Sequence, residues 1–427
     1  MASVKLMEVD GVAVEREETP SSPEELSDAM KRACDAGLSM IPVGGATQLE
    51  LGNPPRSARL ALRTTGLCGI VEYEPDNMTV SVRAGTPLAE LQAVLAAGNQ
   101  LLPIDPPHPA RATAGGIVAA NASGPLRFRY GTIRDMLIGV KICHADGTQT
   151  KAGGKLVKNV TGYDMCKLYT GALGTLGVLT ELTFKVQPRS ESLATVVLNY
   201  SDSARALEAT QLFLRSGLLP DALEAYNASA CSGLPLVDPR APWLLFLRFG
   251  EVDAAVRWQV ARTEELAPST GATATSVLGP PETESFWAAA ASARAAPWQG
   301  GDELRVKCSV LYRSVPGTVA AIEEAGRRLE AETAIFCHAG NYVIYGRYRW
   351  PASGRRGQAE LREALSELRR HVAASGGHAV VEKARPDVKN GWDAWGYDAP
   401  ALEVMRRIKN EFDPKGLLNP GRFVGGI

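Results

Sequence analysis

The chain has 427 residues, 45% of them hydrophobic, and a formal net charge of −1. This length predicts two or three domains, because a single core stops growing at roughly 250 to 300 residues. A net charge this close to zero gives no excess of positive charge, so it does not indicate nucleic-acid binding. No apolar run approaches the roughly 18 residues that a membrane span needs, and acidic residues lie where a signal peptide is apolar. We therefore expect a cytoplasmic protein.

The seven cysteines are widely scattered, with no C-x-x-C pair and no framework of paired spacings. We interpret them as reduced core residues rather than disulfide partners. An iron–sulfur cluster needs clustered thiolates, so the chain cannot ligate one by itself.

The first helix signal leads into the first of three glycine-rich segments. Ser22 as N-cap and Glu25 three positions later form a capping box, and Gly37 ends the helix. A short buried strand over 38–43 then runs into the loop 44–48, GGATQ. Successive backbone N–H groups in such a turn form an anion site, with a plain β-turn as the alternative. The loop lacks the G-x-G-x-x-G and G-K-[ST] patterns, so neither a Rossmann fold nor a P-loop is indicated.

More strands and a second helix follow this loop. The turn-like residues 74–77 separate two predicted strands within 60–82. A helix is predicted between Thr86, as its cap, and Gly98. Further along, the dipeptide Asp-Gly at 146–147 predicts a hairpin.

The second and third glycine-rich segments span 105–124 and 153–188. In the third, glycines recur at every third position from Gly171 to Gly177, which would weaken a helix by roughly 1 kcal/mol each. We therefore predict a compact turn whose backbone approaches a ligand closely. The run 178–186 alternates apolar and polar residues, which predicts a half-buried strand. Three such loops alternating with strands suggest one elongated ligand wrapped by backbone.

The second half of the chain has a different texture, of amphipathic helices between short strands. The predicted helices are 203–216, 252–266, 282–296, 317–332 and 358–375. The predicted strands are 243–249, 303–311, 334–337, 342–349 and 378–383. The stretches 268–281 and 350–357 are interpreted as exposed loops by composition, and no internal repeat is evident.

Several of these segments carry a resemblance to a known family. They are P-V-G-G-A-T at 42–47, A-T-A-G-G-I-V-A-A-N-A-S-G at 112–124, R-Y-G-T at 129–132, K-N-V-T-G-Y-D at 158–164, G-A-L-G-T-L-G-V at 171–178 and F-D-P-K-G-L-L-N-P-G-R at 412–422. Together they resemble the FAD-binding family of the vanillyl-alcohol-oxidase (PCMH) type. Within it, the chain looks most like the smaller flavin-binding subunit, or E subunit, of bacterial glycolate oxidases. The resemblance covers residues 20–190 and the C-terminal tail well, and the middle loosely.

The resemblance implies an α+β fold in three parts. A PCMH-type FAD-binding domain of two α+β subdomains would span 1–189, an α+β cap or substrate domain would span 190–398, and the tail 399–427 would return to the FAD domain. FAD would be held by the three glycine-rich loops and the tail. The implied cofactor-binding residues are Pro42, Gly44, Gly45, Ala46, Thr47, Gln48, Thr113, Gly115, Gly116, Asn121, Gly124, Tyr130, Gly174, Thr175, Gly177, Val178 and Asn419.

The resemblance also bears on how the flavin is attached. Members that bind flavin covalently use a histidine in or beside the pyrophosphate loop, where this chain has Ala46 and Thr47. We therefore expect FAD to be bound non-covalently.

A metal site of related enzymes is incomplete in this chain. Related 2-hydroxy-acid dehydrogenases bind a metal through an H-x-G-D-G-N-x-H run and an E-H-G motif. This chain keeps His338 but has Val343 at the second histidine and Lys383 in the E-H-G equivalent, so we expect no metal. His338 alone is interpreted as a buried strand residue. Arg305 and Arg347 are candidates for a carboxylate pocket, with a solvated sheet face as the alternative.

These observations leave three functional hypotheses. In the first, the chain is the FAD-binding subunit of a glycolate oxidase complex that oxidises glycolate or a similar 2-hydroxy acid, beside a larger flavin subunit and an iron–sulfur subunit. Through that complex it would touch the inner face of the membrane only peripherally. In the second, it is a non-catalytic FAD-binding partner for electron relay or structure. In the third, it is an independent FAD oxidoreductase on another substrate. The sequence does not identify a catalytic base.

Overall fold

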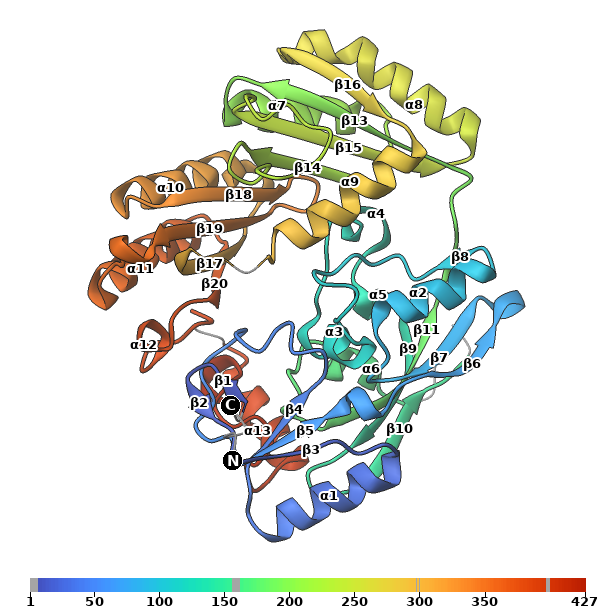
Figure 1. Ribbon diagram of the computed structural model, residues 1–427, viewed down its shortest axis with the longest axis vertical. Coiled ribbons are helices and arrows are strands. Elements are labelled where there is room, and N and C mark those ends of the chain that lie inside the picture. Colours follow the sequence, from blue (N-terminus) through green and yellow to red (C-terminus); the bar gives the residue numbers. More distant parts are fainter. Residues whose placement is uncertain (1–6, 156–161, 297, 299, 397–399) are drawn as a thin grey trace, which may run out of the picture. The chain divides into compact units, whose positions relative to one another are not determined.

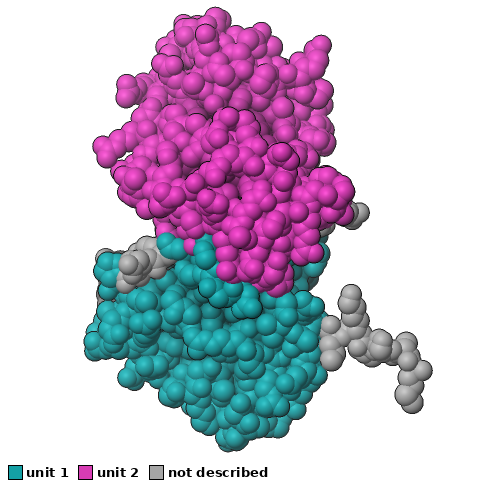
Figure 2. Space-filling view, turned by 90° about the vertical axis from the view of Figure 1, so that its left-hand side faces the viewer, with its two compact units in different colours: residues 1–123, 131–189, 389–427 teal, residues 124–130, 190–388 magenta. Residues whose placement is uncertain are grey.

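The computed structural model describes residues 7–155, 162–296, 298, 300–396 and 400–427. Contacts divide these residues into two units, which Figure 2 colours separately. Unit 1 holds residues 1–123, 131–189 and 389–427, and unit 2 holds 124–130 and 190–388. The C-terminal segment thus returns to the N-terminal unit, while a short piece of the N-terminal half belongs to unit 2.

Unit 1 begins with a small parallel sheet in the order β3-β5-β4. Helix α1 (Pro23–Asp35) precedes β4, and its N-cap Ser22 accepts a hydrogen bond from the backbone N–H of Glu25, as the sequence predicts. Its apolar side, including Leu26 and Met30, is buried against this sheet. The strands are β3 (Arg16–Glu18), β4 (Met40–Val43) and β5 (Leu60–Arg63), with the short pair β1 (Glu8–Val9) and β2 (Val12–Ala13) nearby.

The second sheet of unit 1 is antiparallel, with the order β10-β9-β11-β7-β6 (Figure 1). The predicted turn at 74–77 and the hairpin at 146–147 both lie between neighbouring strands, β6 with β7 and β9 with β10. The strands are β6 (Ile70–Glu74), β7 (Thr79–Arg83), β9 (Leu137–Cys143), β10 (Gln149–Gly153) and β11 (Val178–Lys185). Shorter elements beside it are β8 (Gln100–Leu101), β12 (Gln187–Pro188), α5 (Ile133–Met136) and α6 (Met165–Tyr169).

Two local predictions in unit 1 are wrong. Strand β11 is buried on both faces rather than one, because it is the central strand and its polar residues find partners on β7 and β9. Glu181, for example, lies 2.9 Å from Lys141 Nζ and 3.5 Å from Arg83 Nη1. Thr86 does not cap the following helix, α2 (Leu88–Ala97), whose N-cap is Pro87. The Thr86 hydroxyl instead accepts a hydrogen bond from the backbone N–H of Gly69.

The C-terminal tail completes unit 1. After α13 (Leu402–Phe412), Leu418 forms a parallel bridge with Met40 of β4. The buried ammonium of Lys409 fixes this return, since it donates to the carboxylate of Asp413 and to the carbonyls of Thr175 and Leu418.

Unit 2 is one eight-stranded sheet in the order β16-β13-β15-β14-β18-β19-β17-β20. Its chain order is strand, helix, strand, strand, helix, strand, and this sequence of elements occurs twice. Each half therefore has a ferredoxin-like topology, joined edge to edge between β14 and β18. The first half is β13 (Ser192–Tyr200), α7 (Ser203–Arg215), β14 (Ala222–Asn227), β15 (Trp243–Glu251), α8 (Asp253–Leu266) and β16 (Ala274–Leu278). The second is β17 (Gly301–Ser309), α10 (Val315–Arg328), β18 (Glu332–His338), β19 (Val343–Pro351), α11 (Gln358–Ala374) and β20 (His378–Lys383).

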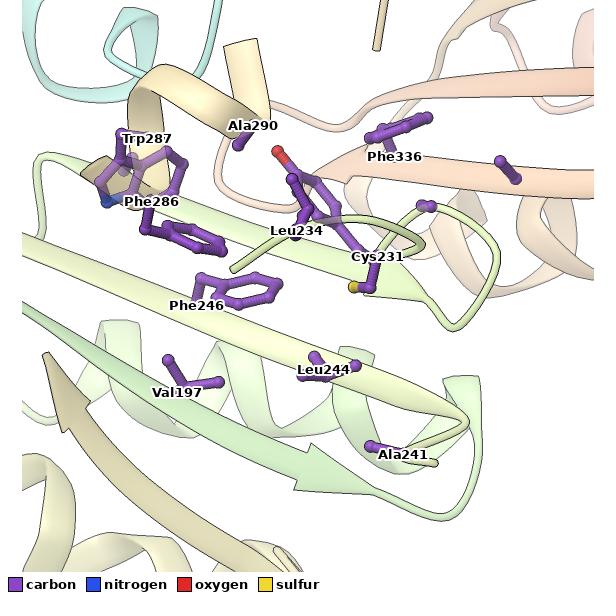
Figure 3. Packing of buried hydrophobic residues seen from close by; sticks show 14 of the residues in the cluster. Val197, Cys231, Leu234, Ala241, Leu244, Phe246, Phe286, Trp287, Ala290 and Phe336 are labelled. Carbon is purple, nitrogen blue, oxygen red and sulfur yellow. The ribbon is translucent and has the colours of Figure 1, made fainter. Parts of the chain in front are cut away.

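Helix α9 (Pro280–Ala293) joins the two halves and packs on the sheet. Figure 3 shows Phe286 and Trp287 of this helix above Phe246 of β15. The rings of Phe246 and Phe286 stack with centroids 4.8 Å apart, and Trp287 Nε1 donates to Thr195 Oγ1. This aromatic cluster is the core on that face of the sheet.

The elements predicted for the second half are present within a few residues of their predicted ends. The stretch 268–281 is a correction, because it contains strand β16 at the edge of the sheet rather than only a loop. A repeat of topology is present although the sequence shows none. Within the described ranges, no helix is long and apolar enough to cross a membrane.

Candidate functional site

Two adjoining pockets in unit 1 form a groove along the three glycine-rich segments. Both are lined by Pro42 of β4, Gly44, Gly116 and Ala119 of helix α3 (Ala114–Ala120), and Gly174. They contain about 480 and 550 Å³ of empty space, counting the open solvent at their mouths. The groove is the unit's candidate site for an extended ligand.

The first loop has glycine because it packs against the second loop. A Cβ on Gly44 would lie 2.2 Å from Thr113 Oγ1, and a Cβ on Gly45 would lie 1.7 Å from the carbonyl oxygen of Arg111. Arg111 Nη2 also donates to the Gly45 carbonyl at 3.2 Å. The close backbone approach that the sequence predicts therefore takes place between two parts of the chain.

The second segment contains a short helix that the sequence interpretation treats as loop. Thr113 is the N-cap of α3, and its Oγ1 accepts from the backbone N–H of Gly116 at 3.2 Å. Asn121 ends the helix in the left-handed region with φ 46°. Its buried Oδ1 has no hydrogen-bond partner in the described part of the chain. An unsatisfied buried acceptor calls for a donor that the protein does not supply.

The tail brings an unsatisfied acceptor to the groove, whose described lining residues do not include Asn121. Asn419 is 2% exposed, has φ 43°, and donates from Nδ2 to the carbonyl of Leu173. Its backbone N–H donates to the carbonyl of Met40 at 2.9 Å. Its Oδ1 has no partner among the residues that the structure describes. Asn419 thus lies in the wall of the groove, as the resemblance implies.

The structure brings most of the implied cofactor-binding residues to this groove. Those that line it are Pro42, Gly44, Gly45, Ala46, Thr47, Gln48, Thr113, Gly115, Gly116, Gly174, Gly177, Val178 and Asn419. Thr175 is buried behind it, with its Oγ1 bonded to the Ala172 carbonyl. Gly124 and Tyr130 are part of unit 2. The first four residues of the motif 158–164 lie outside the described residues.

Sequence reasoning missed several lining residues, of which Arg422 is the most polar. The others are mostly apolar, including Leu49, Thr64, Ala84, Ile142, Tyr169 and Leu176. Arg422 is the last residue of the C-terminal motif at 412–422, so the sequence did contain a motif that could have marked it as a site residue. The apolar residues carry no signal because they look like ordinary core.

A second cluster of polar side chains lies inside unit 2, around His338. The register of β14 and β18 places His338 opposite Glu224, and each side chain is 1% exposed. Nδ1 of His338 lies 2.7 and 2.6 Å from the two carboxylate oxygens of Glu224. We therefore assign the ring proton to Nδ1, which leaves Nε2 as an acceptor. Burial and the cations Arg294, Arg127 and Lys307 hold the pKa of His338 well below its usual value, so the ring is neutral.

Arg294, which the sequence interpretation missed, contacts this histidine. It follows α9, and its Nη1 lies 3.3 Å from His338 Nε2. Its guanidinium also lies 4.2 Å from the ring centroid of Tyr345, which Lys307 Nζ approaches at 5.8 Å. The cations Arg294 and Lys307 thus lie near His338 Nε2, a neutral hydrogen-bond acceptor. This arrangement suits an anionic substrate that also has a hydroxyl proton to donate. No local motif marks Arg294, because its partners come from distant strands.

The predicted anion ligands Arg305 and Arg347 have partners within the protein. Arg305 holds Glu303 through Nε and Nη2 at 2.8 and 2.9 Å, and Arg347 Nε donates to the same carboxylate. Both also donate to the Ala296 carbonyl just after α9, and Arg347 donates to the carbonyl of Ala293, the last residue of α9. Burial alone would raise the pKa of Glu303, but the two arginines outweigh it and hold that pKa below its usual value. These arginines position the backbone on either side of Arg294.

A metal does not fit the His338 cluster. Val343 is buried opposite His338 in the register of β18 and β19, and Lys383 lies 3.5 Å from Glu303. In the described ranges, no three His, Cys, Asp or Glu side chains are grouped so that they could hold a metal ion. A protonated lysine has no lone pair to offer.

Two family models together match most of the chain. The FAD binding domain matches residues 17–153, and the C-terminal domain of FAD linked oxidases matches residues 189–423, more than half of the chain. The chain belongs to the FAD-linked oxidases. It is therefore an FAD-dependent oxidoreductase, and its fold is the PCMH-type FAD-oxidase fold with an α+β second part.

Curated relatives and solved structures agree with this family. The chain is 28% identical over 405 residues to glycolate oxidase subunit GlcE of Escherichia coli, covering 94% of this chain and 97% of the relative. It is 25% identical over 426 residues to glycolate oxidase subunit GlcD of Bacillus subtilis, covering 95% and 87%. The crystal structure of p-cresol methylhydroxylase with substrate bound has a TM-score of 0.74 over 98% of this chain and 91% of that one, at 14% identity. That likeness concerns the fold alone.

The groove of unit 1 fits FAD in its chemistry. Its walls combine the backbone of the glycine-rich loops, which suits close approach by a phosphate chain, with apolar side chains such as Ile142 and Leu176, which suit a flat ring. The unsatisfied Oδ1 atom of Asn419 in its wall needs a donor, and FAD carries hydroxyl and N–H groups that donate.

Proposed function

We propose that this chain is the FAD-binding subunit of a complex that oxidises glycolate or a similar 2-hydroxy acid to the 2-oxo acid. Its partners are a larger flavin subunit and an iron–sulfur subunit, and the complex is cytoplasmic, with at most peripheral contact with the membrane. Support comes from two relatives that are glycolate oxidase subunits and match nearly the whole chain. The seven scattered cysteines support an iron–sulfur cluster on another subunit.

The observation that carries the substrate class is Arg294 beside the His338–Glu224 pair. Oxidation of a 2-hydroxy acid needs a carboxylate anchor and an acceptor for the hydroxyl proton. The planar fork of Arg294 matches a carboxylate. His338 Nε2 takes the hydroxyl proton, and Glu224 at Nδ1 stabilises the charge that the ring then carries. Bound FAD supplies the two-electron acceptor for the hydride from the α-carbon.

Non-covalent attachment is part of the proposal. The groove has no histidine or cysteine among its described lining residues, so the usual side chains for a covalent flavin link are missing there. Acid precipitation should leave the yellow flavin in the supernatant. Colour that stays with the precipitate would exclude this part of the proposal.

One observation favours a second candidate function, an FAD-binding relay or structural subunit without its own substrate chemistry. His338 is 1% exposed, and its Nε2 is already within hydrogen-bonding distance of Arg294. A substrate would have to displace the guanidinium to reach the ring.

Substitutions in the assembled complex separate the two candidates. We would compare the unchanged chain with Arg294→Gln and His338→Asn, and follow flavin reduction after anaerobic mixing with glycolate. Arg240→Gln is the control, because Arg240 is an exposed arginine of unit 2 whose partner is Asp238 two residues away. The proposal is supported if the rate of reduction of this subunit's flavin falls at least tenfold in both variants but not in the control. An unchanged rate of flavin reduction in both variants supports the relay or structural role.

A further inference from the structure

Arg422 is the single charged side chain among the described residues that line the pocket along the first glycine-rich loop. The pocket is otherwise walled by glycine, alanine, leucine and neutral polar residues. Arg422 lies three residues after Asn419, in the same tail segment. It is 3% exposed, so its charge is almost entirely removed from bulk water.

The protein fixes Arg422 from behind the loop. Its Nη2 donates to the carbonyls of Leu49 and Leu51, each at 2.7 Å. Its own carbonyl accepts from Asn53 N and from Trp395 Nε1, at 3.0 and 2.9 Å. The guanidinium is therefore held beside the pocket before any ligand arrives.

The charge of Arg422 lacks a close counter-ion in the described part of the chain. The nearest carboxylate that influences it, Asp10, is in a buried ion pair with Lys389, whose Nζ also donates to the Glu50 carbonyl at 2.7 Å. No ion pair of Arg422 itself is present within 4.0 Å among these residues, and its buried Nε has no hydrogen-bond partner there. A buried charge is costly unless it is paired. The described residues around Arg422 thus supply no anion to pair with its guanidinium.

We propose that Arg422 binds the diphosphate of FAD and supplies the positive charge that neutralises it. The inference rests on FAD occupying the groove, as proposed above. It adds a cation to a pocket whose other described lining residues are uncharged. A diphosphate is the part of FAD that carries negative charge, and a guanidinium hydrogen-bonds phosphate oxygens well. An adenosine or isoalloxazine ring beside Arg422 would leave the charge uncompensated.

The competing explanation is that Arg422 only holds the loop 44–51 in shape. Three variants separate the two roles. Arg422→Lys keeps the charge and loses the planar fork, whereas Arg422→Gln loses the charge and keeps a donor for a loop carbonyl. The double variant Asp10→Asn, Lys389→Gln is the matched control, because it disturbs the same loop at Glu50 without changing net charge.

The measurements are FAD affinity of each apoprotein by calorimetry, thermal unfolding of each apoprotein, and the ³¹P spectrum of bound FAD. We expect Arg422→Gln to weaken FAD binding by about tenfold to a hundredfold, the range for a hydrogen bond to a charged group. The FAD affinity of Arg422→Lys should lie between those of the unchanged chain and Arg422→Gln, and the ³¹P resonances of its bound FAD should be shifted. ADP, which carries the adenosine and the diphosphate of FAD without the flavin, should compete with FAD for the unchanged chain and compete less for Arg422→Gln.

Three results would overturn the proposal. One is FAD affinity of Arg422→Gln within twofold of the unchanged chain. Another is an equal loss in Arg422→Lys and Arg422→Gln, with ³¹P resonances of bound FAD unmoved by the lysine. The third is a loss of the same size in the Asp10→Asn, Lys389→Gln control, which would assign the effect to the shape of the loop. If FAD failed to bind even the unchanged chain, the proposed cofactor site would fail rather than the role of Arg422.

Discussion

At the scale of single residues, the glycines of the first loop have a packing role that the sequence does not reveal. Sequence reasoning requires small residues at Gly44 and Gly45 so that backbone can approach a ligand. In the structure, a Cβ on Gly45 would meet the Arg111 carbonyl at 1.7 Å. The requirement is therefore set by loop packing, which no local pattern reveals.

This packing predicts what Gly45→Ala does. The added methyl group must push the segment around Arg111 away, which widens the groove and displaces both loops. We expect FAD affinity to fall at least tenfold, measured by flavin fluorescence on binding. Gly154→Ala is the control, because a Cβ there has no neighbour within 4 Å. Equal FAD affinity in both variants would show that the loops can move to accommodate the methyl group without weakening FAD binding.

Asp221 of unit 2 gives a prediction about pH. It is 2% exposed, and burial raises its pKa from the usual 3.8 to about 6, against the attraction of Arg248 and Arg129. The folded state therefore holds this proton more tightly than the unfolded state does. The resulting stabilisation is complete below about pH 3.8 and is lost as pH rises through about 6, by up to about 3 kcal/mol.

The Asp221→Asn variant tests the sign of this effect. It cannot release the proton, so its stability relative to the unchanged chain should rise between pH 4 and pH 7. Urea unfolding followed by tryptophan fluorescence at both pH values measures the difference. Parallel stability curves over this interval would contradict a raised pKa.

At the scale of elements, the sequence predicts helices and strands well where one face is apolar and poorly where an element lacks that contrast. The five helices predicted in the second half are all present. Strand β16 was interpreted as loop because Ala274 to Val277 are exposed at the sheet edge and show no alternation. Helix α3 was missed because alanines and glycines beside a ligand loop look like coil. Its cap at Thr113 and the Gly115 N–H bond to the Ala84 carbonyl hold it.

The end of helix α9 depends on a buried ionic clamp. Glu303 is 7% exposed and bonds Arg305 and Arg347, which in turn bind carbonyls after the helix. Glu303→Ala would leave two guanidinium groups without their carboxylate, and breaking such a buried pair costs about 3 to 5 kcal/mol. Glu324→Ala, at the exposed pair with Arg327, should cost at most about 1 kcal/mol. Urea unfolding of the two variants measures this contrast, and similar costs would mean that the clamp is not needed.

At the scale of the whole molecule, sequence reasoning identified the family and the cofactor but not the internal architecture. Loop motifs at 42–47, 112–124 and 171–178 mark the groove because close packing of the backbone at these loops restricts residue type. The two ferredoxin-like halves of unit 2 share a topology that many sequences satisfy, so no repeat is visible in the residues. The Arg294 site follows from that topology, since β14, β18 and the end of α9 meet only in the folded sheet.

The last prediction concerns what the chain does without partners. Its candidate substrate cluster is closed in the structure, because His338 is 1% exposed and Arg294 lies on its only acceptor nitrogen. Among the described residues, no three His, Cys, Asp or Glu side chains are grouped to hold the metal that would anchor a substrate in related enzymes. We therefore expect the isolated chain to bind FAD but to reduce it slowly with glycolate or lactate, and fast reduction to require the larger flavin subunit and the iron–sulfur subunit. Anaerobic stopped-flow mixing with glycolate, alone and after adding those subunits, measures the difference. Rapid bleaching of the flavin band in the isolated chain would mean that this subunit carries a complete active site of its own.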